Sequence, residues 1–91
     1  MSEDGDQSER FLSLVAAGQA KDSRLTSLQA ALIVAAEENI ALDSRSFARL
    51  LGVAHALVLR ELNALVDMGG PLRIVKREAW TLRSVYVVEH P

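Results

Sequence analysis

Residues 42–69 contain two stretches in which apolar residues recur at helical spacing, and a single glycine, Gly52, separates them. The shorter stretch precedes Gly52, and the longer one follows it and ends at Gly69. Glycine readily adopts the positive φ that a tight turn between two helices requires. This pattern is typical of a helix-turn-helix, which we place at residues 44–68.

A β-hairpin is expected directly after this motif. Residues 72–77 and 82–88 alternate apolar and polar side chains, as strands do, and residues 78–81 would form the tip between them. Gly69, Gly70 and Pro71 separate the hairpin from the preceding helix, because proline cannot continue a helix. The expected fold is mainly α with a small β-hairpin, an α+β winged helix-turn-helix with the wing at residues 72–88.

Two further helices are expected before the motif. Asp6 and Glu9 have the spacing of a capping box, which predicts a first helix over about residues 7–20 with Phe11 and Leu14 on its inner face. Thr26 and Gln29 form a second such pair and predict a helix that ends near Glu38. The chain should therefore have a three-helix core plus an extra N-terminal helix, all within one domain over residues 7–91.

The helix-turn-helix itself has defined ends and faces. Asp43 or Ser44 should cap its first helix, with Phe47, Leu50 and Leu51 directed inward. In its second helix, the inward stripe would consist of Val58, Leu62, Leu65 and Val66, and the outward face would carry Ala56, Arg60 and Asn63. Residues 40–42 would form a short extended link that could pair with the wing as an edge strand.

Composition constrains where the protein acts. The chain has no cysteine, which favours an intracellular protein without disulfides. Residues 1–6 are acidic and polar, the opposite of a secretory signal, and we expect them to be disordered. The longest apolar run, residues 30–36, is far shorter than the roughly 20 residues that span a bilayer. A cytoplasmic protein without membrane association is expected.

The charges are unevenly distributed along the chain. Residues 1–43 hold three basic and eight acidic residues, whereas residues 44–91 hold seven basic and four acidic ones. The C-terminal half therefore has a net charge of +3, although the whole chain has −2. Binding to phosphate depends on the local field, so a nucleic-acid partner remains compatible with the acidic total.

Three segments resemble the multiple-antibiotic-resistance regulator family of winged-helix transcription regulators: residues 25–29 (LTSLQ), 46–53 (SFARLLGV) and 58–69 (VLRELNALVDMG). The likeness covers about residues 25–88. It implies a homodimer that binds double-stranded DNA sequence-specifically, with the second motif helix in the major groove and the wing beside the minor groove. The long terminal helices by which family members dimerise are not in this sequence, so the first helix is the expected alternative dimer contact.

The sequence departs from the family where Ser or Thr would cap the second motif helix and contact phosphate. Ala54, Leu57 and Leu59 occupy those positions. Leu57 and Leu59 either flank the core stripe or form an exposed apolar patch for a protein partner. The second possibility defines an alternative function, a protein assembly module without physiological DNA binding, whose interface would include Leu57, Leu59, Phe11 and Leu14.

Candidate DNA contacts fall into two groups. For base reading we name Arg60 and Asn63, since guanidinium and carboxamide groups can bond guanine and adenine bidentately, together with Ala56 on the same face. Arg60 could instead pair with Glu61 or Asp67. The second group contacts the backbone and the minor groove. His55 at the helix start and Arg45 and Arg49 near the first motif helix suit phosphates, and Arg77, Trp80 and Arg83 in the wing, near Arg73 and Lys76, suit the minor groove.

Each of these residues also has a purely structural interpretation. His55 could be an ordinary surface histidine, and the basic wing a solvated edge hairpin protected from aggregation by its charge. Trp80 is expected to pack over the hairpin, since one aromatic does not make a stacking platform. No nucleophile, metal or phosphate-loop pattern is present, so we expect no enzyme, no cofactor and no metal.

Overall fold

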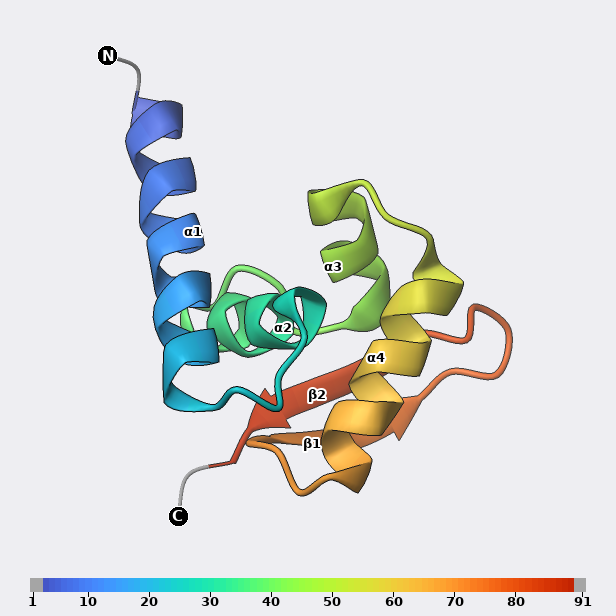
Figure 1. The fold of residues 1–91 in the computed structure, drawn as a ribbon. Helices are drawn as coiled ribbons and strands as arrows, with labels where there is room; N and C mark the ends of the chain where they lie inside the picture. Colours follow the sequence, from blue (N-terminus) through green and yellow to red (C-terminus); the bar gives the residue numbers. More distant parts are fainter. Residues whose placement is uncertain (1–2, 90–91) are drawn as a thin grey trace.

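A computed structural model of the chain describes the backbone of residues 3–89 and the side chains of residues 8–89. Within this range four helices precede a two-stranded antiparallel hairpin, a mixed α+β arrangement as expected (Figure 1). The elements are α1 (Glu3–Lys21), α2 (Ser27–Glu37), α3 (Ser44–Leu51), α4 (His55–Asp67), β1 (Leu72–Arg77) and β2 (Ser84–Val88).

Helix α2 lies at the centre of the molecule. Its N-terminus has the capping box expected from the sequence: Gln29 N donates to Thr26 Oγ1 at 3.1 Å, and Thr26 N donates to Gln29 Oε1 at 3.0 Å. Most of its residues are buried, including Leu32 and four alanines. Small side chains let neighbouring elements approach on several sides, so one short helix supports both halves of the fold.

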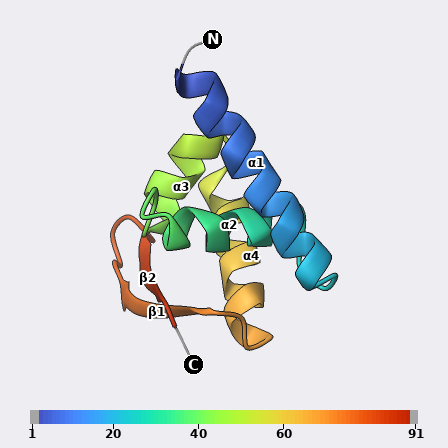
Figure 2. The ribbon, with the colours of Figure 1, turned by 90° about the vertical axis from the view of Figure 1, so that its left-hand side faces the viewer.

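Helix α1 packs along one side of α2, away from the hairpin (Figures 1 and 2). Val15 is buried in this contact, and Phe11 and Leu14 pack against the core. The helix begins at Glu3 rather than near residue 7, so residues 3–6 are helical instead of disordered and the expected capping box at Asp6 does not mark the helix start. Residues 1 and 2 lie outside the described residues.

The turn between α3 and α4 forms where the sequence predicts it. Asp43 is the N-cap of α3, and Gly52 ends the helix with φ of +66°. Phe47 is fully buried, but the expected inward position of Leu50 is wrong, because half of that side chain is exposed. The buried face of α3 instead passes through Ser44, Phe47 and Ala48 and is rotated away from Leu50.

In the hairpin, β1 pairs with β2 in antiparallel register, with an irregularity between Ile74 and Lys76. β2 begins two residues later than expected, after Leu82, which has a positive φ of 59° and therefore interrupts extended backbone. Tyr86 of β2 is fully buried in the core. The expected edge pairing of residues 40–42 is reduced to one bridge between Asp43 and Val85 and a hydrogen bond from Tyr86 N to Leu42 O.

Candidate nucleic-acid interface

The outer face of α4 is open to solvent. Val58, Leu62 and Leu65 are fully buried on its inner face, as the spacing predicted. On the opposite side Ala56 is exposed, and the Arg60 side chain is 74% exposed. The Arg60 guanidinium lies 3.8 Å from Glu61 Oε1, a long contact of little energetic value because the guanidinium itself is in solvent. Arg60 can therefore leave this contact to reach a ligand.

Asn63 and Arg77 connect α4 to the hairpin. The amide of Asn63 is half-buried, and its Oδ1 accepts a hydrogen bond from Arg77 Nη2 at 3.1 Å. Because the carboxamide is neutral, Arg77 keeps its full positive charge. Asn63 is thus less available for base contact than Arg60, and it positions a cation at the edge of the same face.

Arg45 connects the start of α3 to the hairpin tip. Its Nε and Nη2 both donate to the Thr81 carbonyl oxygen, at 3.0 and 2.7 Å. The acceptor is again neutral, so the guanidinium charge is retained, but two donors expected to reach phosphate are used within the chain. Arg49 is exposed, and among the described residues it has no ion-pair partner.

Ion pairs within the hairpin reduce the charge of its other basic residues. Arg83 contacts Glu78 twice, Nε to Oε1 at 2.6 Å and Nη2 to Oε2 at 3.1 Å. The Lys76 ammonium lies 3.8 Å from the same carboxylate. Arg83 is consequently a brace across the base of the tip, and Lys76 is the more exposed cation of the two.

The expectation that Trp80 packs over the hairpin is wrong, because its side chain is 99% exposed. The loop between β1 and β2 projects beyond the body of the molecule (Figure 1), and the indole lies outside the core. Leu82, in the same loop, is 63% exposed. The tip therefore presents two large apolar side chains to solvent.

His55 occupies the first position of α4, where a phosphate contact was expected. Its Nε2 lies 2.7 Å from Ser44 Oγ, which also accepts a hydrogen bond from Ser84 N at 2.9 Å. Burial, together with the positive charge of Arg45, lowers the pKa of His55 against the opposing effect of Asp43. The ring is therefore neutral at pH 7 and links α3, α4 and β2 rather than adding a positive charge.

Asp43 adds a fixed negative charge near this contact. Burial acts to raise the pKa of its carboxyl, but hydrogen bonds from Ser46 N and Ser46 Oγ, at 2.8 and 2.7 Å, and the nearby charge of Arg83 lower it overall. The carboxylate is ionised at neutral pH. It offsets part of the positive field at the hairpin end.

The residues proposed for a protein interface do not form one surface. Phe11 and Leu14 pack against the core from α1, across α2 from α4. Leu57 and Leu59 are half-buried and lie outside the core cluster. Leu59 instead lines an open groove of about 300 Å³ between α4 and the hairpin tip, together with Asn63, Arg77, Glu78, Ala79, Leu82 and Ser84.

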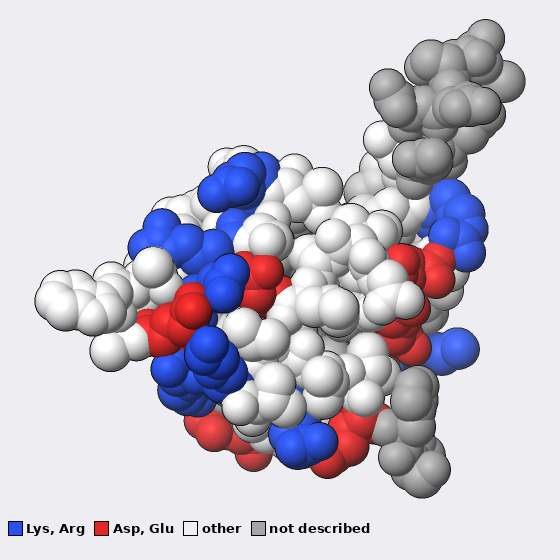
Figure 3. Space-filling view, turned by 180° about the vertical axis from the view of Figure 1, so that it is seen from behind, with Lys and Arg blue, Asp and Glu red and all other residues white. Residues whose placement is uncertain are grey.

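The charges gather unevenly on the surface. Figure 3 shows Lys and Arg side chains concentrated toward the hairpin end of the molecule, with a few acidic side chains among them. Arg45 and Arg77 have neutral acceptors and Arg49 is exposed, so at least these three keep uncompensated charge. The face formed by α4 and this end is the strongest candidate for a polyanionic ligand.

Several residues that organise this face were not identified from the sequence. Ser44 bonds Ser84, 40 positions away, and Thr81 acts through its backbone oxygen on Arg45, 36 positions away. Glu78 pairs with Arg83 across the loop. The only sequence signal at Ser44 was its position at a helix start, which also fitted a simple capping role. A serine buried in an otherwise apolar face becomes recognisable only after the fold is known.

Comparison of the chain with protein-family models, curated proteins and solved structures finds no match. Among the described residues, no helix has the length and apolar character to cross a membrane. Within the same part of the chain, no group of three or more His, Cys, Asp or Glu side chains is arranged to hold a metal ion. The function is therefore inferred from the geometry and charge of the surface described above.

Proposed function

We propose that the chain is a winged helix-turn-helix protein that binds double-stranded DNA sequence-specifically and regulates transcription as a homodimer in the cytoplasm. In this proposal α2, α3 and α4 form the three-helix core, and the hairpin is the wing. The chain acts as a binding protein and not as an enzyme. The observation that carries the proposal is the exposed face of α4 with Arg60, next to two cations that are held by neutral acceptors, Arg77 of β1 and Arg45 at the start of α3.

Helix α4 enters the major groove in this arrangement. Its 13 residues correspond to a length of about 20 Å. Arg60 would bond a guanine edge, because it is the exposed polar side chain in the middle of the outer face. The hairpin would lie along the adjacent DNA backbone, where Lys76 and Arg77 of β1, together with Arg49 of α3, neutralise phosphates.

Two candidate contacts take different roles in this proposal. Asn63 holds Arg77 in place and reads a base only secondarily, because its Oδ1 already accepts one hydrogen bond. His55 fixes the start of α4 against α3 and β2, because its Nε2 lies at hydrogen-bond distance from Ser44 Oγ. Specificity therefore rests mainly on Arg60. In a dimer, the two copies of α4 would occupy half-sites about 34 Å apart.

Selection of bound duplexes from a random pool, followed by titration of the selected duplex at several salt concentrations, tests this proposal. Arg60→Ala should cost about 1–3 kcal/mol at one base pair and relax the preference there. Arg49→Ala should weaken all sequences alike and reduce the salt slope by about one. Arg24→Ala is the matched control, since Arg24 is exposed and hydrogen-bonded to Asp22 on the connection between α1 and α2.

The result that contradicts DNA binding is the absence of any complex at low salt with the wild-type chain. Equal losses over all sequences for Arg60→Ala would contradict the base-reading role alone. The stoichiometry of the selected complex, measured by sedimentation, tests the dimer. A single copy on a site without two half-sites would overturn it.

A protein assembly module is the second candidate function. It is favoured by the apolar N-terminal part of α4, where Ala54 makes no side-chain capping bond and Leu59 lines the groove beside Leu82. If this function holds, no DNA complex forms at low salt, and Leu59→Glu abolishes association with the protein partner. If DNA binding holds, Leu59→Glu weakens DNA binding through charge repulsion.

A further inference from the structure

Trp80 is the only tryptophan in the chain, and its side chain is 99% exposed. An indole is one of the largest apolar groups a protein can bury, and burying it against a partner makes a large contribution to binding. Here it contributes nothing to the core, although the fold has only four aromatic residues by composition, two Phe, one Tyr and this Trp. An exposed position of this kind suits a residue that becomes buried in a complex.

The backbone around Trp80 is held from both sides. Arg45 donates two hydrogen bonds to the carbonyl of Thr81, the next residue. Thr81 Oγ1 accepts from Arg83 N at 3.2 Å, and Glu78 N donates to Arg83 O at 2.9 Å. The indole is thus presented from a braced loop, which lowers the entropy lost when a partner orders it.

The tip combines this apolar group with a cationic surround. Leu82 is also exposed in the same loop, and Arg45, Lys76 and Arg77 lie on the elements that hold the loop. Glu78 and Asp43 offset part of the charge, mainly that of Arg83. Arg45 and Arg77, whose acceptors are neutral, lie beside this apolar tip, and the combination complements a ligand with a phosphate backbone and stacked aromatic bases.

We propose that Trp80 inserts between adjacent base pairs of duplex DNA from the minor groove and opens the stack at that step. The inference rests on the proposed DNA binding, in which the hairpin lies beside this groove. Apolar side chains that enter the minor groove between base steps partly unstack and kink the duplex. Flexible pyrimidine–purine steps are the easiest to open, so a TA step under the hairpin is the preferred substrate.

The test uses two probes with the full-length chain at low salt: a short duplex with a central TA step, and the same duplex with one unpaired adenine at that step. Labelled-duplex anisotropy measures binding, and the intrinsic fluorescence reports Trp80 alone. Binding should quench the emission through stacking. The bulged duplex should bind about three- to tenfold more tightly, because less stacking must be lost when a base is already unpaired.

Substitutions separate insertion from simple contact. Trp80→Ala should weaken binding about tenfold, equivalent to about 1.4 kcal/mol, and remove the preference for the bulge. Trp80→Phe should restore part of both. Leu12→Ala is the matched control, because Leu12 is 66% exposed on α1, far from the hairpin, and its loss should change neither quantity. Circular dichroism verifies that each variant is folded.

Unquenched emission in a formed complex, with the bulge preference unchanged in Trp80→Ala, would overturn the insertion and leave DNA binding intact. No complex with either duplex would overturn both proposals. Vesicles of anionic phospholipid form a third arm. A blue shift of the emission with vesicles, without quenching by DNA, would overturn base insertion and assign the tip to a lipid surface.

Discussion

The elements on the two sides of α2 are held in place by different kinds of contact. On one side α1 packs mainly through apolar and small residues, and a Cβ added to Gly18 would lie 3.8 Å from the Ala30 Cβ. An ion pair between Arg10 and Glu38 adds a polar contact there. On the other side, α3, α4 and the hairpin share the apolar core, and side-chain hydrogen bonds, some to side chains and some to backbone, also connect them to one another. Apolar packing is non-directional, whereas a hydrogen bond requires a defined distance and angle.

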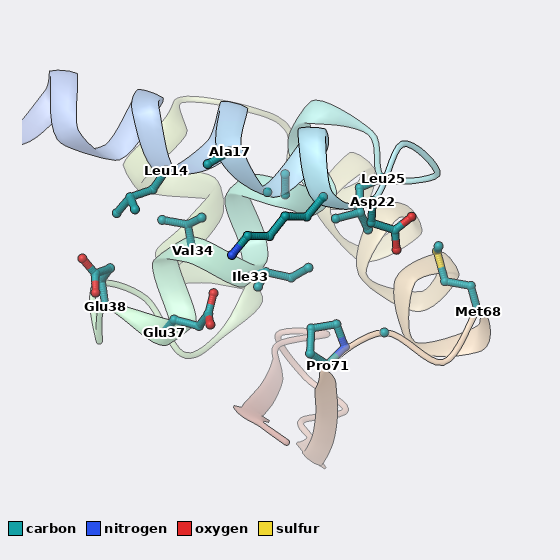
Figure 4. A pocket seen from close by; sticks show the side chains of 14 residues that line it. Leu14, Ala17, Asp22, Leu25, Ile33, Val34, Glu37, Glu38, Met68 and Pro71 are labelled. Atoms are coloured by element: carbon teal, nitrogen blue, oxygen red, sulfur yellow. The ribbon is translucent and has the colours of Figure 1, made fainter. Parts of the chain in front are cut away.

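Both sides have an open groove, and the one on the α1 side has a larger volume than the groove of about 300 Å³ beside the hairpin tip. A groove of about 460 Å³ lies between α1, α2 and the loop before β1 (Figure 4). Leu14, Ile33 and Val34 line it, and Glu37 and Glu38 lie at one end. More of the described side-chain hydrogen bonds lie among α3, α4 and the hairpin than between α1 and its neighbours. We therefore expect α1 to be the less firmly attached element.

The two phenylalanines provide the largest test of this contrast. Phe47 is fully buried beneath α3, and Phe11 is half-buried on α1. Phe47→Ala should lower the free energy of unfolding by about 3–5 kcal/mol, because it leaves a cavity in the core. Phe11→Ala should cost about 1–2 kcal/mol, since less apolar area is lost. Urea denaturation followed by circular dichroism measures both, and equal losses would contradict the weaker attachment of α1.

Ser44 provides the next largest effect, on the polar side of the comparison. Both Ser44 and Ser84 are buried, and Ser44→Ala leaves Ser84 N without its acceptor and His55 Nε2 without its partner. The expected loss is about 1–3 kcal/mol of unfolding free energy, for only one oxygen removed. Ser46→Ala is the comparison for an exposed serine: it removes the bond from Ser46 Oγ to Asp43 but keeps the bond from the backbone N–H, so its cost should stay below about 1 kcal/mol. Similar losses for both serines would show that the buried network carries no special stability.

Local features of the fold were predictable from the sequence. The capping box at Thr26, the N-cap at Asp43, the positive φ of Gly52 and the buried stripe of α4 all depend on residues within a few positions of one another. Spacing alone encodes such interactions. The same reasoning located both strands, although β2 began later because Leu82 takes a left-handed conformation.

The arrangement of the candidate site depends on partners that spacing does not reveal. Arg45 and Thr81 are 36 positions apart, and Ser44 and Ser84 are 40 apart. The count of charges along the sequence includes Arg45 and Arg83 as free cations. In the structure Arg45 is hydrogen-bonded to the Thr81 carbonyl and Arg83 is paired with Glu78. The exposure of Trp80 could not be derived either, because it depends on how far the tip projects beyond the core. The basic and aromatic residues were identified, but their division into braces and free groups required the structure.

The smallest expected effect is a pH dependence of stability that arises from His55. Its pKa is lowered in the folded chain from the usual value of 6.5, so below that value the unfolded state binds more protons than the folded state. The contribution of His55 to stability is therefore complete above pH 6.5 and declines as the pH falls through the lowered pKa of the folded state. Protonation would require Ser44 Oγ to accept from both His55 and Ser84 N, which leaves its own hydroxyl proton unpaired.

Urea denaturation at about pH 7.5 and about pH 5.5 should show a lower unfolding free energy at the lower pH for the wild type, and a smaller difference for His55→Gln. His90→Gln is the control for the second histidine, which lies outside the described residues, and it should keep the wild-type difference. If His55→Gln kept the full pH dependence of the unfolding free energy and His90→Gln lost it, the effect would belong to His90 and not to the contact between His55 and Ser44.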